Sequence, residues 1–311
     1  MRSPPIASPR ATFVLESMKR DCLVCGGKYR PSRIRGLLRC EECSFTTADL
    51  NLSEAQLRQL YTAGYFAGNE YRDYVADRPV IEKQFRLRLE RLLRFVPEAL
   101  DKNLFEIGCA HGFFLEVANN AFKSVEGIDI SEDAIAYARQ QLGVKARSSE
   151  FLTCQFAVPP DLICLWDTIE HVARPDLYLQ KIADSLPQKG ILALTTGDIG
   201  SWLARSRGGK WRQIHPPTHL HYFSRKTLEH LLRRHGFVTK FIASEGMYRS
   251  VDTMAYIVLC LKHNLPWLYS WLRKTQLLRW ELYLNFGDIF FVVAEKNDAG
   301  GMKKAKNGVV E

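Results

Sequence analysis

The stretch LFEIGCAHGFFLEV, residues 104–117, constrains the fold of this chain more than any other. Its apolar beginning predicts a strand that ends at Glu106, and Gly108 and Gly112 predict a tight turn that opens into a helix. Seventeen residues beyond Gly112, the run SVEGIDI ends in a carboxylate, Asp129. A strand, a tight turn and a helix N-terminus form a socket for a nucleoside-bearing cofactor, and an acidic residue at the end of the next strand suits ribose hydroxyls.

The spacing of this turn differs from the dinucleotide fingerprint G-x-G-x-x-G. Ala110 lies between the two glycines, and Phe113 takes the place of the third. The carboxylate of Glu106, two residues before Gly108, suits an ammonium group better than a pyrophosphate. The pattern therefore favours S-adenosylmethionine, which has an ammonium group, a ribose and an adenine but no phosphate. An alanine at position 110 costs little if its φ is negative and more if its φ is positive.

Strand and helix patterns alternate from Leu104 onward, and such alternation predicts a parallel sheet with helices on both faces. A preceding helix, with apolar residues at helical spacing, is predicted to cover the sheet. The expected helices are 79–96, 112–121, 132–142, 176–185 and 225–235. The expected strands are 104–108, 124–130, 161–166, 190–196, 237–244 and 286–296.

Four motifs follow one another in an order that resembles the class I S-adenosylmethionine-dependent methyltransferases: EIGCAHGFFLEVA, EGIDISEDAIAYAR, DLICLWDTIEHVARPDLYL and LPQKGILALTT. The resemblance implies a Rossmann-like α/β fold, with a doubly wound, mostly parallel seven-stranded sheet and an antiparallel last strand. One departure is Ala110, where the family has a glycine. The cofactor contacts expected are Glu106, Gly108, Ala110, Gly112, Asp129, Ile130, Glu150, Phe151 and Asp167.

Four of the eight cysteines form two C-x-x-C pairs separated by fourteen residues: Cys22, Cys25, Cys40 and Cys43. Each pair can hold a metal from a tight turn, and two pairs form the four-thiolate tetrahedron of a structural zinc site. The residues between the pairs predict a short hairpin through Tyr29 to Leu38. Because four thiolates leave no position for water, we expect the zinc to be structural. Many methyltransferases that act on sugars resemble this layout.

Composition sets broader limits. A chain of 311 residues can form one large domain and one small one. The absence of an apolar signal core in residues 1–20, and cysteines scattered through apolar contexts, indicate a reducing cytoplasm. The whole chain has a net charge of +9, and residues 201–250 hold ten basic and two acidic side chains. Most of the positive charge thus lies in one segment, so an anionic partner is a fair inference. A solvated basic face is the alternative.

The chain divides into five expected segments: a flexible leader (1–19), a zinc knuckle (20–48), a helical and aromatic linker (49–98), a catalytic domain (99–296) and a disordered tail (297–311). The linker begins with a helix from Ser53 to Tyr61 that has a capping box. Its aromatic residues could cover cofactor and acceptor, or simply join two domains. They are Tyr61, Tyr65, Phe66, Tyr71 and Tyr74.

An insertion at 246–284 is rich in Leu, Trp and Tyr, and predicts two helices separated by Pro266. Three tryptophans alternate there with basic residues, which is typical either of a helical pair packed on the sheet or of a segment that rests on a membrane surface. Its charges and its proline exclude a spanning helix. The residues concerned are Trp267, Trp271, Trp280, Arg273, Lys274 and Arg279.

The reaction is expected at the carboxyl ends of the strands. The run WDTIEHVARP resembles the D-x-x-E-H-x-x-x-P motif of small-molecule methyltransferases and places His171 beside the cofactor. A second run, WRQIHPPTHLHYFS, resembles an element found in methyltransferases of polysaccharide and lipid-linked glycan synthesis. Histidines of both runs suggest a general base, ranked His219, His171, His221, and a structural histidine is the alternative for each. A metal site around His215, His219 and His221 is conceivable, but no carboxylate keeps ligand spacing.

The leading hypothesis is a cytoplasmic methyltransferase, with possible contact at the inner membrane face, that acts on a sugar hydroxyl or carbon of an anionic nucleotide- or lipid-linked acceptor. An RNA-modifying methyltransferase is the second hypothesis, in which the knuckle and the basic residues would hold phosphates. Nucleic acid is the less favoured partner, because the motifs typical of base methylation do not occur. A non-catalytic zinc-ribbon module on a degenerate cofactor fold is the third.

Overall fold

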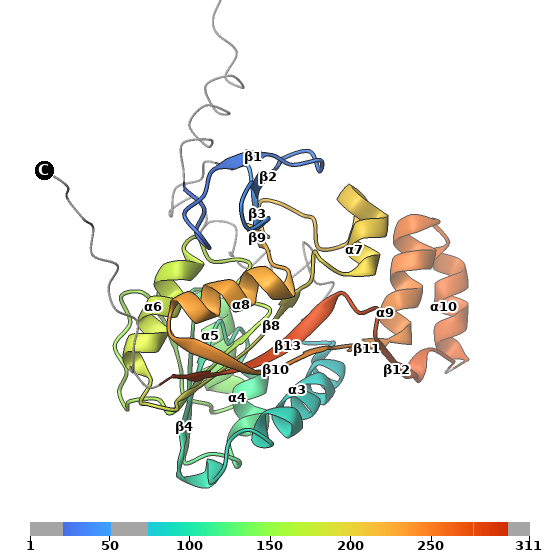
Figure 1. Cartoon of the computed structure of the whole chain (residues 1–311). Coiled ribbons are helices and arrows are strands. Elements are labelled where there is room, and N and C mark those ends of the chain that lie inside the picture. Colours follow the sequence, from blue (N-terminus) through green and yellow to red (C-terminus); the bar gives the residue numbers. More distant parts are fainter. Residues whose placement is uncertain (1–20, 51–73, 276, 298–311) are drawn as a thin grey trace, which may run out of the picture.

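The computed structural model describes residues 21–50, 74–275 and 277–297 (Figure 1). The predicted leader, the helix from Ser53 to Tyr61 and nearly all of the tail lie outside the described residues. Four of the five predicted lid residues, Tyr61, Tyr65, Phe66 and Tyr71, lie outside them as well.

A seven-stranded sheet forms the centre of the molecule, as predicted, in the order β10-β13-β8-β7-β4-β5-β6. Strand β13 pairs antiparallel with both of its neighbours, and the other pairings are parallel, which confirms the antiparallel last strand. The short strand β6 had no counterpart among the expected strands. In chain order the strands are β4 (Asn103–Ile107), β5 (Ser124–Asp129), β6 (Ala146–Ser148), β7 (Leu162–Trp166), β8 (Ile191–Gly197), β10 (Phe237–Ser244) and β13 (Ile289–Lys296).

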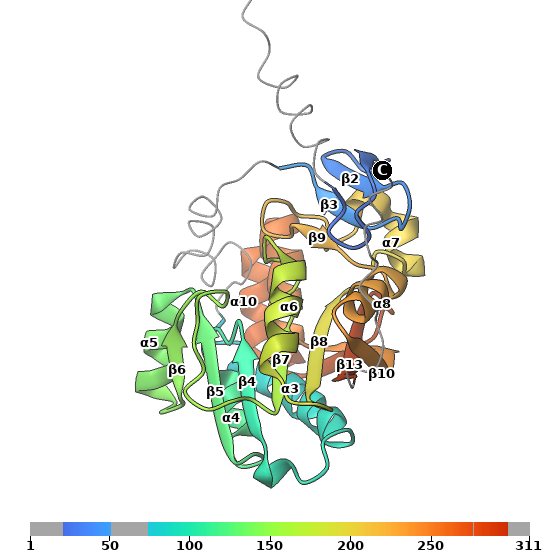
Figure 2. The same ribbon diagram turned by 60° about the vertical axis from the view of Figure 1, so that its left-hand side comes forward.

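Successive residues of the central strands face opposite sides of the sheet and bury two separate cores. On one side, Phe105 and Ile107 pack with α6 (Pro175–Ser185) and α8 (Arg225–Arg234). On the other side, Leu104 packs with α3 (Arg78–Leu93), α4 (Phe113–Ala118) and α5 (Glu132–Gln141) (Figures 1 and 2). Because both faces are covered, β7 and β8 read as nearly continuous apolar runs, LICLW and ILALTTG.

The winding of the sheet reverses direction at β4. From β4 the chain moves outward to β5 and β6, and then returns to β7 on the other side of β4 before continuing to β8. The connection that follows β4 therefore leaves toward one edge of the sheet, and the connection that follows β7 leaves toward the other edge. Such a switch point leaves a crevice, which is where open α/β sheets bind ligands.

The cysteine-bearing unit is a small sheet of three strands, β1 (Tyr29–Pro31), β2 (Leu37–Cys40) and β3 (Thr46–Ala48). The predicted hairpin is β1 paired with β2. A strand from the large domain, β9 (His221–Tyr222), pairs with β3 and extends this sheet. Figure 2 shows the unit seated beside β9 and α8.

Contacts from side chains join this unit to the large domain. Phe45 lies 5.6 Å from the ring of His221 and 5.2 Å from the ring of Phe223. Arg234, at the end of α8, donates to the carbonyls of Leu23 and Val24. The unit therefore shares a hydrophobic core with the helices above the sheet.

The insertion contains the two expected helical segments, α9 (Val251–Tyr256) extended by the π-turn η4 (Ile257–Lys262), and α10 (Pro266–Lys274). It also contains elements that the sequence did not indicate: strands β11 (Met247–Ser250) and β12 (Glu281–Leu284), which pair antiparallel. Its tryptophans are exposed rather than packed on the sheet, at 67% for Trp267, 57% for Trp271 and 69% for Trp280. No helix among the described residues is long and apolar enough to cross a membrane.

Short helical segments complete the described chain. They are α7 (Trp202–Arg207) and the 3-10 turns η2 (Ala99–Asp101), η3 (Gly208–Lys210) and η5 (Leu277–Arg279).

Candidate functional site

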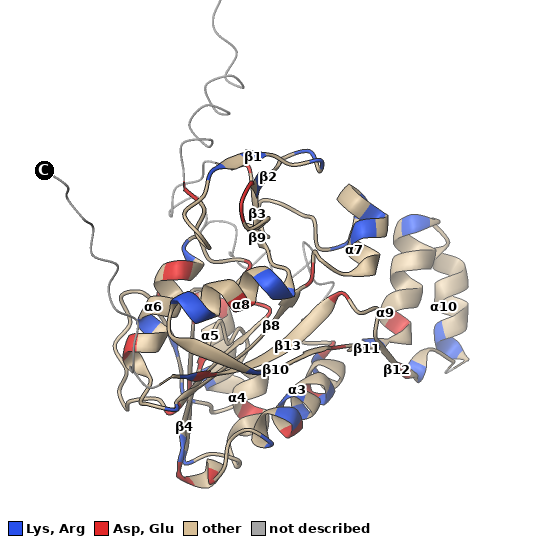
Figure 3. Ribbon diagram, viewed as in Figure 1, with Lys and Arg blue, Asp and Glu red and all other residues tan. Residues whose placement is uncertain are grey.

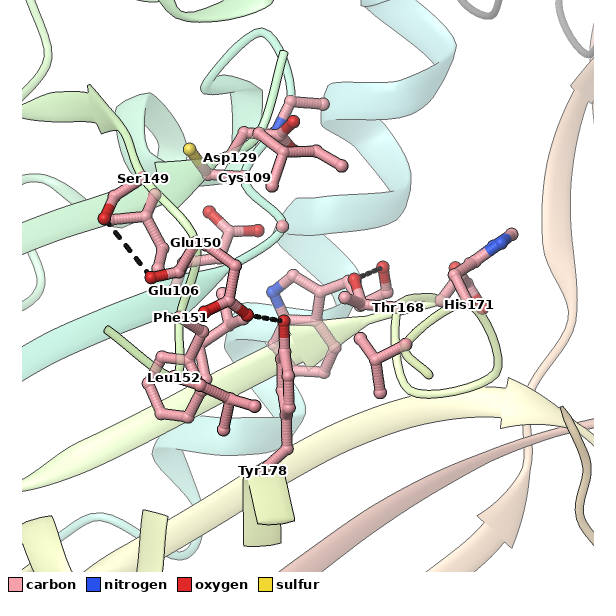
Figure 4. A pocket seen from close by; sticks show the side chains of 18 of the residues that line it. Glu106, Cys109, Asp129, Ser149, Glu150, Phe151, Leu152, Thr168, His171 and Tyr178 are labelled. Carbon is pink, nitrogen blue, oxygen red and sulfur yellow. Dashed lines mark hydrogen bonds between the residues drawn. The ribbon is translucent and has the colours of Figure 1, made fainter. Parts of the chain in front are cut away.

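A cavity of about 240 Å³ lies at the switch point, at the carboxyl ends of β4, β5 and β7. Figure 4 shows Glu106, Asp129 and Glu150 in this cavity, the predicted cofactor pocket, with Thr168 and His171 toward one end. Eight of the nine predicted cofactor contacts line it: Glu106, Gly108, Ala110, Asp129, Ile130, Glu150, Phe151 and Asp167. The ninth, Gly112, lies outside the lining and begins α4 with a φ of 79°.

The turn after β4 is held by hydrogen bonds to β5. The amides of Gly108 and Cys109 both donate to the carbonyl of Ile128, at 2.8 and 2.9 Å. The amide of Ala110 donates to Oδ2 of Asp129 at 2.9 Å, and the amide of Ser131 donates to Oδ1 at 2.9 Å. Each carboxylate oxygen has a second lone pair, so Asp129 can fix the turn and still accept from a ribose hydroxyl.

The backbone of Ala110 is left-handed, with a φ of 46°. This is the costlier of the two conformations considered for an alanine at this position, because its Cβ crowds the following carbonyl in the left-handed region. The hydrogen bond to Asp129 offsets part of that strain. Gly108 has a φ of 77°, and a Cβ there would lie 2.6 Å from Oγ1 of Thr168, so the turn requires a glycine at this point.

Glu106 brings a buried carboxyl group to the floor of the pocket. It is 1% exposed, and its Oε2 has no hydrogen-bond partner among the described residues. Burial, and secondly the charge of Asp129, raises the pKa of Glu106 well above its ordinary value, while Arg88 opposes this shift. A cationic group placed in the pocket would satisfy that oxygen and favour its ionised form.

Arg88 is a functional residue that the sequence reading did not identify. It is buried on α3, and it donates to Oδ2 of Asp167 at 2.8 Å and to Oε2 of Glu245 at 3.1 Å. Asp167 itself follows β7 with a φ of 49°. These two carboxylate bonds, of which the one to Glu245 is buried, orient the guanidinium and hold α3 against the strand ends. Position 88 lies three residues after Phe85, on the apolar stripe of the helix. An arginine at such a position is unusual, and this could have marked Arg88 as a buried charged residue.

The opposite wall comes from the segment after β6 and from α6. Tyr178 donates to Oε1 of Glu150 at 2.9 Å, and its ring packs on Phe151 with 5.0 Å between centroids. Ile130 is 40% exposed at the rim. The one described lid residue, Tyr74, lines the cavity and stacks on Phe113 at 5.3 Å.

The three predicted bases occupy different environments. His171 lines the pocket, and burial lowers its pKa to about 4. His219 lies behind it, with 4.5 Å between the two ring centroids, and burial also lowers its pKa. His221 is outside the lining: its Nδ1 lies 3.1 Å from Oγ1 of Thr47, so it belongs to the contact between the two sheets. The neighbouring His215 lies 3.7 Å from His219 by ring centroids.

A second cavity, of about 430 Å³, adjoins the cofactor pocket. The two share Tyr74, Phe85, Arg88 and Asp167. From there the second cavity extends between α3 and the insertion. Its remaining lining combines apolar side chains with polar and charged ones. The apolar ones are Val80, Ile81, Met247, Met254, Ile257, Leu284 and Phe286, and the others are Asp77, Gln84, Arg212, Tyr248, Arg249, Ser250 and Thr253.

Several basic residues of the segment 201–250 are paired with acids. Arg212 lies 3.1 Å from Asp288, and Lys240 lies 3.0 Å from Glu295. Figure 3 shows other basic residues of this segment along α7. The basic excess therefore serves partly to balance buried or half-buried acids within the fold.

The four predicted metal ligands do come together. The sulfurs of Cys22 and Cys43 are 3.6 Å apart, and those of Cys25 and Cys40 are 3.5 Å apart. All four sulfurs lie within 4.8 Å of one another. This donor set is compatible with a tetrahedral zinc ion.

Comparison with known proteins gives a consistent result. A family model described as a methyltransferase domain matches residues 80–239. The chain is 32% identical over 100 residues to a ubiquinone biosynthesis O-methyltransferase of Caulobacter vibrioides, covering 30% of this chain and 40% of the relative. A second such enzyme, from Caulobacter sp. strain K31, is 28% identical over 123 residues, or 35% of this chain and 49% of the relative. The chain thus spans less than half of the length of these curated relatives.

The fold is similar to that of a solved S-adenosylmethionine-dependent methyltransferase from Thermotoga maritima. The TM-score is 0.50 at 19% identity, over 74% of this chain and 95% of the other. At this level of identity the similarity concerns the fold alone.

Two glycine variants test the turn. Gly108→Ala and Gly143→Ala both place a Cβ at a positive φ, but only the first meets a neighbour, since nothing lies within 4 Å of the second. Both variants should lose about 1–2 kcal/mol of unfolding free energy from backbone strain. Gly108→Ala should lose more, and should also bind S-adenosylhomocysteine more weakly, as measured by denaturant unfolding and calorimetry. Equal losses in stability and unchanged binding would contradict the assigned role of Gly108.

Proposed function

The chain belongs to the methyltransferase domain family, and from this premise we propose that it transfers a methyl group from S-adenosylmethionine to the oxygen of a small-molecule acceptor. The observation that carries the proposal is the buried Oε2 of Glu106, which has no hydrogen-bond partner among the described residues, in a pocket that the carboxylate of Asp129 also lines. An ammonium group and a ribose diol are the two cofactor groups that match such carboxylates. S-adenosylmethionine, when bound, supplies a methyl group on a sulfonium.

In this proposal the residues of the chain bind the cofactor, orient it toward the acceptor and shield the reacting atoms. Glu106 would bind the ammonium group, Asp129 the ribose, and Ile130, Glu150 and Phe151 the adenine side of the pocket. Arg88 holds Asp167 at the junction of the two cavities. Holding acceptor oxygen, methyl carbon and sulfur in line contributes about 7–11 kcal/mol in well-oriented reactions, which is more than a single proton acceptor contributes.

The second cavity supports an acceptor that is apolar along part of its length and anionic elsewhere. Its walls combine methionine, isoleucine, leucine and phenylalanine side chains with arginines. It meets the cofactor pocket at Asp167, where the reacting atoms would have to lie. The names of the curated relatives state O-methylation, which favours a hydroxyl acceptor. A sugar hydroxyl on a lipid-linked carrier, as predicted from the sequence, meets the same requirements.

Of the predicted bases, His171 is the one that lines the pocket. A base with a pKa of about 4 is weak at neutral pH, so its direct contribution to proton removal is small. His219 and His221, both buried, remain predictions as bases.

Product formation tests the proposal. The full chain is incubated with methyl-labelled S-adenosylmethionine and fractionated cell extract, and the labelled product is identified. Asp129→Asn should incorporate at least about tenfold less label, since loss of one charge-assisted hydrogen bond costs about 1.5–3 kcal/mol. The control Asp133→Asn changes an exposed acid on α5 and should keep full activity. Absence of any labelled small molecule with the unaltered chain would remove the proposal.

Proton release on cofactor binding provides an independent test of Glu106. The raised pKa favours a proton on Glu106 in the free protein, whereas the ammonium group favours the ionised carboxylate. Binding of S-adenosylhomocysteine should therefore release a proton and tighten as pH rises toward the pKa of Glu106. Calorimetry in buffers of different ionisation enthalpy measures this release.

Glu106→Gln should bind more weakly and lose that proton release. Glu132→Gln, which changes an exposed acid on α5, should behave as the unaltered chain. Unaltered proton release in Glu106→Gln, or affinity that falls with rising pH, would show that this carboxyl does not meet the ammonium group.

We also propose that the four clustered cysteines bind a structural zinc ion. Zinc binding of this type contributes on the order of 10 kcal/mol or more to folding of a small unit. Removal of zinc by a chelator should abolish hydrogen-exchange protection in β1–β3 and reduce it in β9, which pairs with β3. Protection in β4 and β7 should remain. Cys43→Ser should reproduce this pattern and Cys260→Ser should not; identical protection with and without zinc would contradict the proposal.

The exposed tryptophans of the insertion support a further proposal, that this face rests on an anionic membrane. Trp267 and Trp271 lie one turn apart on α10, and Arg273 and Lys274 follow them. The chain should co-sediment with vesicles of phosphatidylglycerol, and the double variant Trp267→Ala, Trp271→Ala should bind these vesicles more weakly. Trp202→Ala removes an even more exposed tryptophan from α7 and is the control. A loss of the same size with the control, or no sedimentation, would refute membrane contact.

A further inference from the structure

Three side chains that the sequence reading did not group as metal ligands meet beside the cofactor pocket. Glu170 and His171 follow β7, and His219 comes from the segment before β9. One ligand atom from each lies within 4.8 Å of the others. The carboxylate that the histidine-rich run lacked is therefore supplied by a different part of the chain.

The backbone holds these two segments together. The carbonyl of Glu170 accepts hydrogen bonds from the amides of Leu220 and His221, at 2.9 and 3.1 Å. The carbonyl of Thr218 lies 2.8 Å from Nδ1 of His171. The cluster is thus built by a fixed backbone connection and not by flexible side chains meeting at a surface.

The hydrogen bonds of the two histidines define which nitrogen of each ring is an acceptor. A carbonyl oxygen only accepts, so Nδ1 of His171 donates to Thr218, and Nδ1 of His219 donates to the carbonyl of Gln213 at 3.0 Å. In a neutral ring the other nitrogen, Nε2, then has the lone pair. Metal-ligating histidines almost always have this arrangement, in which the distal N–H is fixed by a carbonyl or carboxylate.

Glu170 adds a buried carboxylate oxygen. The residue is 3% exposed, and its Oε2 has no hydrogen-bond partner among the described residues. Ligand atoms of two imidazoles and a buried carboxyl group therefore gather in one place. A buried carboxyl oxygen without a partner among the described residues is costly unless a donor or a cation completes it.

We propose that Glu170, His171 and His219 bind a divalent transition-metal ion at the edge of the cofactor pocket. Two imidazoles and one carboxylate are a donor set that such ions accept while keeping coordination positions open. His171 lines the pocket, so the open side of the ion faces the space where the acceptor reacts.

Resting on the proposed methyl transfer, the ion has a defined role in it. An ion held by these three residues would lower the pKa of an acceptor hydroxyl bound to it, so that the hydroxyl proton could pass to solvent. That oxygen then forms a bond to the methyl carbon, while the carbon–sulfur bond breaks and its electron pair stays on sulfur.

A titration with Mn²⁺ tests the site. Mn²⁺ is detected by its paramagnetic resonance signal, and as a harder ion it does not displace zinc from thiolates. The zinc-loaded full chain should remove one equivalent of Mn²⁺ from solution. Glu170→Gln and His219→Asn should each weaken Mn²⁺ binding at least about tenfold, since even outer-shell partners of metal ligands contribute that much. Asparagine retains an N–H near the position of Nδ1 and removes Nε2.

The control is His230→Asn, which changes an exposed histidine on α8 and should leave Mn²⁺ binding unaltered. Binding of S-adenosylhomocysteine to each variant reports whether the pocket is still folded. Failure of the unaltered chain to bind Mn²⁺, or binding by folded Glu170→Gln and His219→Asn as tight as by the unaltered chain, would overturn the metal site. Mn²⁺ binding without any S-adenosylhomocysteine binding would keep the metal site and overturn the proposed methyl transfer.

Discussion

The carboxylate of Asp129 is the interaction on which the site depends. It accepts from the amide of Ala110 in the turn after β4 and from the amide of Ser131 at the start of α5. One side chain thereby fixes the ends of two neighbouring strands relative to each other. The left-handed backbone of Ala110, and the glycines that flank it, are consequences of bringing the turn close enough to make this bond.

The pocket also depends on acidic side chains that are buried or half-buried around it and that need cationic partners. Arg88 lies between Asp167 and Glu245 and pairs with both, so it fixes the junction of the two cavities. Glu106 and Glu170 have an oxygen without a protein partner among the described residues. Unsatisfied buried oxygens are costly, and their presence at two points around one pocket is physically sensible if cationic groups complete them.

The features predicted correctly from the sequence are those that a short-range residue pattern determines. Alternation of apolar strands and amphipathic helices yielded the sheet with its antiparallel last strand, and eight of nine expected cofactor contacts line the pocket. The prediction missed pairings that depend on tertiary contact. Strand β9 is two residues long and pairs with the cysteine-bearing unit, which explains why His221 lies outside the pocket lining. Glu170 and His219 are far apart in the chain, so no spacing rule could group them. Arg88 interrupts an apolar helical stripe, and hydrophobic periodicity alone does not say what such a charged residue contacts.

The central claim is that the strand-end pocket is a preformed binding site for S-adenosylmethionine. The most direct measurement is a crystal structure of the full chain grown with S-adenosylhomocysteine. We expect the ligand between the turn at Gly108 and the end of β5, with its ribose hydroxyls on Asp129 and its ammonium group at Glu106. A pocket filled by the protein's own side chains, or a ligand bound elsewhere with Asp129 contacting only the amides of Ala110 and Ser131, would contradict this account.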